Sequence, residues 1–109
     1  MKLWTQEIEQ RATRFPLGSQ DGKGLDSTVL VKYFNPYGNG DWIITEASPQ
    51  ENGDWLMFGY CHLTEWEFGY VLLSEILNTK VDVYGCQMSL ERDLYIGENA
   101  TVRDLAQGY

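Results

Sequence analysis

The heptapeptide Trp66-Glu-Phe-Gly-Tyr-Val-Leu72 is the segment from which the fold can be predicted most directly. Large apolar side chains alternate in it with smaller or charged ones, and a period of two residues is typical of a β-strand with one face against a core. We therefore expect a strand in which Trp66, Phe68 and Tyr70 are buried and Glu67 lies in water.

Three further runs rich in β-branched and aromatic residues precede this strand, at residues 28–34, 41–47 and 55–63. The connections between them are short, and the Asn52-Gly53 pair is a signature of a tight hairpin. Short connections favour antiparallel neighbours, so the sequence predicts an antiparallel meander of four or more strands.

Helical signals lie at both ends of the chain. Apolar residues recur at helical spacing over residues 3–12, and Pro16 should end that helix. Ser74 is placed to cap a short helix, and residues 101–104 resemble a capping box. We predict an α+β fold: residues 1–109 form a single domain, in which an N-terminal helix packs on the antiparallel β-meander and a short helical turn ends the chain. The expected core also includes Trp4, Ile8, Val29, Val31 and Tyr33.

The charge distribution is the strongest functional signal. The chain has 16 acidic and eight basic residues, a net charge of −8, and residues 33–79 contain no Lys or Arg. An acidic surface repels nucleic-acid phosphates and anionic membranes and attracts basic protein surfaces. We expect two acidic rims beside hairpin turns, flanking exposed parts of Trp42 and Trp55. The candidate interaction residues are Trp42, Trp55, Asp41, Glu46, Glu51, Asp54, Glu65 and Glu67.

The compartment follows from the cysteines and from hydropathy. Cys61 and Cys86 are too few for a disulfide framework, and we interpret both as free buried thiols. The first residues lack the apolar run of a signal peptide, and no segment approaches the length of a membrane span. We expect a reduced, cytoplasmic protein.

Signals for catalysis are weak. His62 follows Cys61, but neighbouring residues of a strand point to opposite faces and form no local dyad. Glu91 and Asp93 share one face of an extended segment, where two carboxylates could bind a cation or share a proton. Most simply, these groups are structural or solvated, so we expect no catalytic residue, metal or cofactor. The glycine-rich loop at residues 18–24 lacks the P-loop spacing; it is a flexible connector or, less simply, grips a ligand.

Several motifs occur in a recognisable order. They are Leu17-Gly-Ser-Gln-Asp-Gly-Lys-Gly24, Val31-Lys-Tyr-Phe-Asn-Pro36, Phe58-Gly-Tyr60 and Glu91-Arg-Asp-Leu-Tyr95. With them the chain resembles, over residues 3–105, a family of small bacterial proteins of unknown function that is associated with plasmids, integrated elements and phages. The resemblance implies a mobile genetic element but no activity. The chain departs from the family pattern over residues 78–88.

Three hypotheses remain open. The first is an acidic protein-interaction module that binds a host or element-encoded protein with a basic surface. One form of it is an anti-defence factor, in which carboxylates imitate phosphates in the DNA-binding groove of a restriction or CRISPR effector. The second is an accessory protein of plasmid maintenance that contacts nucleic acid through cations near the two ends of the chain. The third is a small enzyme that uses Glu91, Asp93 and His62. The sequence leaves the oligomeric state undetermined.

Overall fold

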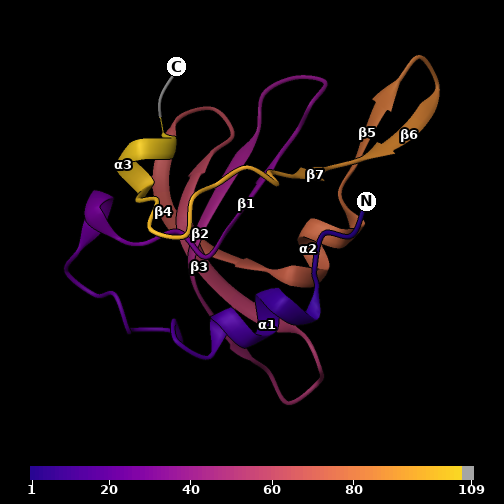
Figure 1. Cartoon of the computed structure of the whole chain (residues 1–109). Helices are drawn as coiled ribbons and strands as arrows, with labels where there is room; N and C mark the ends of the chain where they lie inside the picture. Colours follow the sequence, from indigo (N-terminus) through magenta and orange to yellow (C-terminus); the bar gives the residue numbers. More distant parts are fainter. Residues whose placement is uncertain (107–109) are drawn as a thin grey trace.

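The computed structural model describes residues 1–106 and has seven strands, three α-helices and one 3-10 helix there (Figure 1). The helices are α1 (Gln6–Ala12), the 3-10 helix η1 (Gly24–Asp26), α2 (Leu73–Asn78) and α3 (Val102–Leu105). The strands are β1 (Val31–Phe34), β2 (Asp41–Pro49), β3 (Trp55–His62), β4 (Trp66–Leu72), β5 (Lys80–Val83), β6 (Cys86–Ser89) and β7 (Glu91–Arg92). No helix within residues 1–106 has the length and apolar character needed to cross a membrane.

Five of the strands form one antiparallel sheet, in the order β4-β3-β2-β1-β7. The first four strands follow one another in the sheet as they do in the chain, which is the predicted meander. α1 precedes the sheet and α3 follows it (Figure 1). The α+β prediction is therefore confirmed, and β4 spans the heptapeptide that predicted it.

One face of the sheet, here called the helix face, is covered by α1 and α2. Ile8 and Ala12 of α1 pack in one cluster with Val31 and Tyr33 of the sheet and Ile76 of α2. Thr5 caps α1, because its hydroxyl accepts a hydrogen bond from the backbone N–H of Ile8 at 3.2 Å. The buried Tyr33 hydroxyl donates to the carbonyl oxygen of Leu3 at 2.6 Å and so attaches the N-terminal segment to the sheet.

The opposite face, here called the aromatic face, is covered only in part. Val29, Ile43 and Val102 form a small buried cluster there, and Tyr60 and Trp66 pack against it. α3 contributes Val102 and is capped as predicted. The Thr101 hydroxyl accepts from the N–H of Asp104, and the Asp104 carboxylate accepts from the N–H of Thr101.

The predicted burial of β4 was wrong for two of its three aromatic residues. Trp66 is half-buried, whereas Phe68 is 40% exposed and Tyr70 is 68% exposed. The alternation is correct, because all three lie on the same face. Within residues 1–106, α3 is four residues long, and its cluster reaches Trp66 but includes neither Phe68 nor Tyr70.

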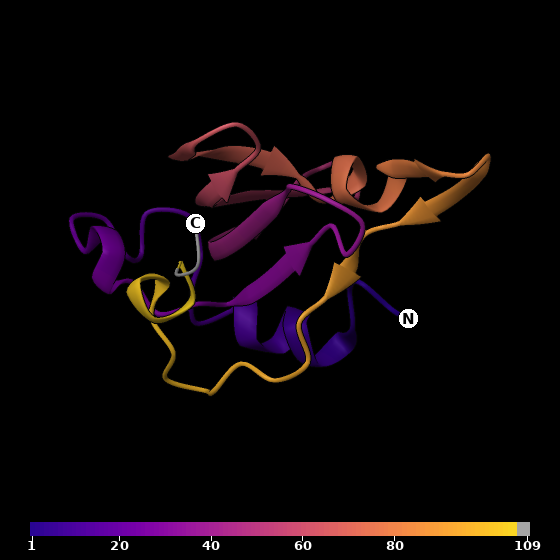
Figure 2. The same cartoon turned by 90° about the horizontal axis from the view of Figure 1, so that it is seen from above.

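The segment that follows β4 also differs from the prediction. α2 begins at Leu73 with Leu72 as its N-cap residue, and Ser74 instead binds Asp54. β5 and β6 then form a hairpin that projects from the rest of the molecule (Figures 1 and 2). Its two-residue turn has Tyr84 and Gly85 at positive φ, as a type I′ turn requires. Cys86 is exposed on this hairpin, so only Cys61 partly fits the expected burial.

A β-bulge interrupts the pairing of β2 with β3. Ile44 pairs with Gly59 and Glu46 pairs with Phe58, so Thr45 is the extra residue. The bulge brings the backbone of β2 over Gly59. A Cβ atom at position 59 would lie 2.8 Å from the Cα atom of Ile44 and closer still to the carbonyl oxygen of Ile43. Only glycine fits at this position.

We predict that Gly59→Ala destabilises the protein by about 1–3 kcal/mol, because the inserted methyl group forces the two backbones apart. Gly69→Ala is the matched control, since Gly69 pairs with Gly59 across β3 and β4 and a Cβ atom at position 69 would have no neighbour within 4 Å. The free energy of unfolding in urea measures both. Equal costs for the two variants would contradict the close approach at Gly59.

Tyr33 gives a prediction for alkaline pH. Burial raises the pKa of the Tyr33 hydroxyl above its usual value, against a weaker opposite effect of Arg92. The folded protein therefore holds this proton at a pH where the unfolded chain loses it, and stability falls as the pH rises above about 10. Urea unfolding at pH 8 to 11 tests this. Tyr33→Phe should reduce the alkaline loss; an unchanged pH profile in that variant would rule Tyr33 out as its cause.

Candidate functional site

The β3–β4 hairpin carries a continuous set of aromatic side chains on the aromatic face. Directly opposed residues of an antiparallel pair point to the same side of the sheet, and the three successive opposed pairs of this hairpin on that face are aromatic. They are Phe58 with Tyr70, Tyr60 with Phe68, and His62 with Trp66. We call these six residues the aromatic ladder.

The rings of the aromatic ladder contact one another along its length. The ring centroids of Tyr60 and Phe68 are 4.5 Å apart, and those of Phe58 and Tyr70 are 4.9 Å apart. Tyr60 and Trp66 stack at 4.9 Å, with 13° between their planes. One end of the ladder is covered by the α3 cluster, and the Phe68–Tyr70 end is open. β4 is also the edge strand of the sheet, so this end offers both ring surface and unpaired backbone groups.

The glycine-rich loop lies beside the aromatic ladder and is fixed to the sheet by hydrogen bonds. The backbone N–H groups of Gly18 and Gln20 donate to the two carboxylate oxygens of Glu46, each at 2.8 Å. The Gln20 side-chain amide donates to the carbonyl oxygens of Thr28 and Thr45 and accepts from the N–H of Thr28. This segment connects α1 to the sheet, as predicted, and these hydrogen bonds define its path; its expected flexibility stays a prediction.

A cavity of about 370 Å³ separates the glycine-rich loop from the aromatic ladder. Its lining is Gln20, Asp21, Gly22, Gly24, Ser27, Thr45, Glu46, Phe58 and Phe68. Two carboxylates and two phenyl rings are present in it, and no Lys or Arg is. Carboxylates beside aromatic rings suit a cation, since both attract positive charge.

The six predicted acidic residues differ in burial: three are exposed, two are buried and Asp54 is half-buried. Glu51, Glu65 and Glu67 are exposed, as an acidic rim requires. Asp41 and Glu46 are buried, so the expectation that they line an exposed rim was wrong. Asp41 forms an ion pair with Lys32 at 3.8 Å, and the bulge turns Glu46 under the glycine-rich loop.

Asp54 is half-buried and serves the structure. It accepts hydrogen bonds from the Ser74 hydroxyl at 2.6 Å and from the backbone N–H of Trp55 at 2.8 Å. These bonds, that of the hydroxyl first, lower the pKa of the Asp54 carboxyl. Asp54 thus connects the β2–β3 turn to the start of α2.

The two tryptophans of the predicted rims are half-buried. Both pack at the edge of the core cluster of the helix face. The Trp55 ring lies 5.1 Å from that of Trp4, and Trp42 is paired in register with Tyr33 and Cys61. Neither belongs to the aromatic ladder on the opposite face.

The three residues of the enzyme hypothesis do not converge. Glu91, Phe34, Asp41 and His62 occupy successive positions in one row across β7, β1, β2 and β3. Three strand spacings separate Glu91 from His62, which is about 14 Å. Glu91 and Asp93 line a separate cavity with Lys32 and Asp41. Within residues 1–106 no cluster of three or more His, Cys, Asp or Glu side chains is arranged to hold a metal ion.

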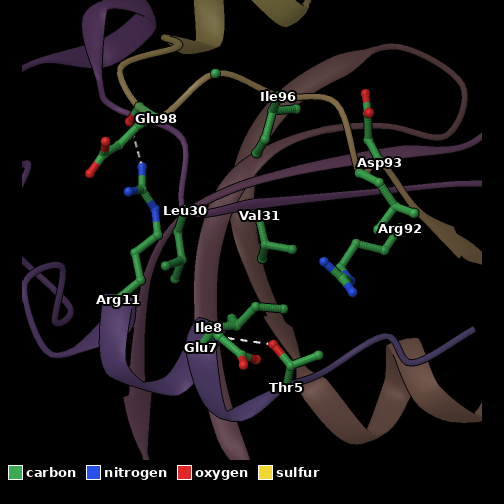
Figure 3. Close-up of a pocket in the computed structure, with 12 residues that line it drawn as sticks. Thr5, Glu7, Ile8, Arg11, Leu30, Val31, Arg92, Asp93, Ile96 and Glu98 are labelled. Carbon is green, nitrogen blue, oxygen red and sulfur yellow. Dashed lines mark hydrogen bonds between the residues drawn. The ribbon is translucent and has the colours of Figure 1, made fainter.

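Another cleft, of about 400 Å³, lies between α1, β1 and the segment after β7 (Figure 3). Arg11 and Arg92 stand on opposite sides of an apolar floor that includes Leu30 and Val31 (Figure 3). The Arg11 guanidinium donates through Nη2 to the carbonyl oxygens of Val29 and Glu98, at 3.0 and 2.7 Å. Cations from the two ends of the chain therefore do meet in space. We call this cleft the arginine cleft.

The arginine cleft is nevertheless not a basic patch. Glu7, Asp93 and Glu98 line it together with the two arginines, so the charges of its side chains sum to −1. The pKa of Glu7 is lowered by hydrogen bonds of its backbone and of Thr5 and, to a smaller extent, by Arg92. Phosphate groups would meet three carboxylates here, which opposes nucleic-acid binding.

The sequence interpretation missed the open end of the aromatic ladder, and it missed Asp21 as a site residue. Phe58 and Tyr60 alternate in β3 as Phe68 and Tyr70 do in β4, and a hairpin between these strands necessarily pairs them. That pattern could have indicated an aromatic face, but the sequence interpretation did not use it. The pattern does not reveal whether another element covers this face.

The chain belongs to the family described as protein of unknown function (DUF2958), whose model matches residues 3–107. This confirms the resemblance to a family without an assigned function. No match was found among curated proteins or among solved structures.

The two thiols should differ in reactivity. Cys86 is exposed, whereas burial and, to a smaller extent, the Glu67 carboxylate raise the pKa of the Cys61 thiol to about 11. Because the thiolate is the reactive form, we predict that one thiol per chain reacts rapidly with Ellman's reagent at pH 8 and that the second reacts only in denaturant. Cys86→Ser should abolish the rapid phase. Two rapid thiols in the native protein would contradict the burial of Cys61.

Proposed function

We propose that the protein is an acidic protein-interaction module, which binds a basic protein surface through the open end of the aromatic ladder. The observation that carries this proposal is the exposure of Phe68 and Tyr70 on an edge strand, in contact with the further rings of Phe58 and Tyr60. A contiguous exposed aromatic surface is typical of an interface, and tyrosine is among the residues that contribute most binding energy there.

The charge of the chain supports a basic partner. Residues 33–79 contain no Lys or Arg and include the whole aromatic ladder, and the net charge is −8. Glu65 and Glu67 are exposed at the turn and in the strand that present the ladder. The negative electrostatic potential of these carboxylates speeds the approach of a cationic partner, and it opposes the approach of nucleic acid.

The more specific form of this proposal is an anti-defence factor of a mobile genetic element. Its partner would be a restriction or CRISPR effector, whose DNA-binding groove is basic. The carboxylates would occupy the place of DNA phosphates, and the rings would contribute apolar contact. The acidic charge and the resemblance to proteins of plasmids and phages support this form.

The other two hypotheses have less support. The arginine cleft, which is the meeting place of cations from both ends of the chain, contains more carboxylates than guanidinium groups. Glu91 and His62 stand three strands apart in the sheet. An interaction module is therefore the function that the geometry favours.

Affinity capture from a lysate of a bacterial host, with quantification of the bound proteins by mass spectrometry, tests the proposal. We predict that Tyr70→Ser lowers the affinity for the captured basic protein at least about tenfold, as loss of an aromatic anchor does. Tyr95→Ser is the matched control, because Tyr95 is 93% exposed but lies outside the aromatic ladder. Equal retention by the Tyr70 and Tyr95 variants would contradict the proposed surface.

The charge contribution is tested by the rate of association with the same partner. Glu65→Lys with Glu67→Lys should slow association more than it speeds dissociation, and added salt should reduce the association rate of the native protein. Competition by duplex DNA for the captured protein tests the anti-defence form. A partner that binds DNA and this protein together would exclude that form.

A further inference from the structure

We propose that the cavity between the glycine-rich loop and the aromatic ladder is an arginine subsite, which takes one arginine side chain of the partner protein. This inference rests on the proposed function and deepens it, because it assigns a particular contact to a particular cavity. The cavity has about 370 Å³ and opens beside Phe68, next to the exposed end of the ladder.

Glu46 is the first observation that points to a cationic occupant. This residue is 3% exposed, and it lines the cavity. Within residues 1–106 the ion pairs are Lys32–Asp41 and Arg103–Asp26, so Glu46 has no cation as a partner there. A buried carboxylate is normally paired with a cation.

The hydrogen bonds of Glu46 do not use the full acceptor capacity of its carboxylate. Each carboxylate oxygen accepts one backbone N–H, from Gly18 or from Gln20. A carboxylate has about four acceptor positions, so about two remain for the N–H groups of a ligand. Asp21 provides a second, exposed carboxylate from the loop side of the same cavity.

The aromatic wall favours arginine over lysine. The rings of Phe58 and Phe68 lie nearly parallel, with 10° between their planes and 5.8 Å between their centroids. A planar guanidinium can stack on a free face of such a ring, with its N–H groups in a parallel plane and directed toward carboxylates. An ammonium group has no flat face to stack and is more strongly hydrated.

Hydrogen bonds hold the loop wall of the subsite in place without a ligand. Gln20 is buried and makes three side-chain hydrogen bonds, which hold the loop at a fixed distance from β2. The bulge at Thr45 directs Glu46 to the same face as Phe58. A preformed cavity reduces the entropy lost when a side chain is bound.

The experiment uses three small probes: the acetylated amides of arginine, of lysine and of citrulline, which is the neutral analogue of arginine. Titration of the labelled full chain is followed by NMR. The arginine probe should cause saturable shifts in the amide signals of Gly18, Gln20 and Gly22 and in the ring signals of Phe58 and Phe68. The citrulline probe should bind at least about tenfold more weakly, since it lacks the charge.

Two variants that each remove one negative charge are compared: one alters the subsite, and the other is the control. Asp21→Asn should weaken binding of the arginine probe at least about threefold, whereas Glu67→Gln, whose side chain points to the helix face, should leave it unchanged. Phe68→Leu should weaken binding as well, because it removes the flat ring. The amide spectra report whether each variant is folded.

Three results would overturn the subsite: absence of saturable shifts in the loop, equal binding of the lysine or citrulline probe, or equal weakening by Glu67→Gln. Partner capture distinguishes this failure from that of the proposed function. If capture depends on Tyr70 but the arginine probe does not bind, the subsite is wrong and the interaction surface stands. If the probe binds as expected but Tyr70→Ser does not affect capture, the proposed function is wrong.

Discussion

The β-bulge at Thr45 sets the arrangement of the aromatic face and of the glycine-rich loop. It inserts one residue into β2 and so places Glu46 on the aromatic face, where strict alternation would put it on the helix face. The same insertion brings two backbones so close that Gly59 admits no side chain. From its new position the Glu46 carboxylate binds the N–H groups of Gly18 and Gln20. A single extra residue thus determines where the glycine-rich loop lies.

The two faces of the sheet differ because the helices are unequally distributed. α1 and α2 bury the helix face, and Tyr33 and Asp54 make the hydrogen bonds that attach the N-terminal segment and α2 to it. Within residues 1–106 the aromatic face is covered by η1, α3 and the glycine-rich loop. Side chains suited to a core therefore remain in water at the end of the sheet near Phe68 and Tyr70. An edge strand with exposed rings and few cations nearby is a surface suited to another protein.

The arginine cleft and the aromatic ladder illustrate how charge and shape act together. In the cleft, carboxylates accompany both guanidinium groups, so the site has no strong preference for one sign of charge. In the cavity beside the ladder, carboxylates and rings act in the same direction, and no cation competes with a ligand. Because the carboxylates and the rings favour the same kind of ligand, the cavity beside the ladder is a stronger candidate binding site than the arginine cleft.

The order and the pairing of the first four strands follow from local features of the amino-acid sequence. Period-two patterns and short turns act between neighbours in the chain, so the meander and the common face of Trp66, Phe68 and Tyr70 could be predicted. The capping box at Thr101 could be predicted for the same reason. Which face of the sheet is covered, and that Asp41 and Glu46 are buried, became evident only from the packed molecule. These outcomes depend on contacts between distant segments, such as residues 18–20 with Glu46, and on one bulge that shifts the alternation. Local sequence patterns reveal neither the contacts between distant segments nor the bulge. The reason is that burial is a property of the packed molecule and not of the strand.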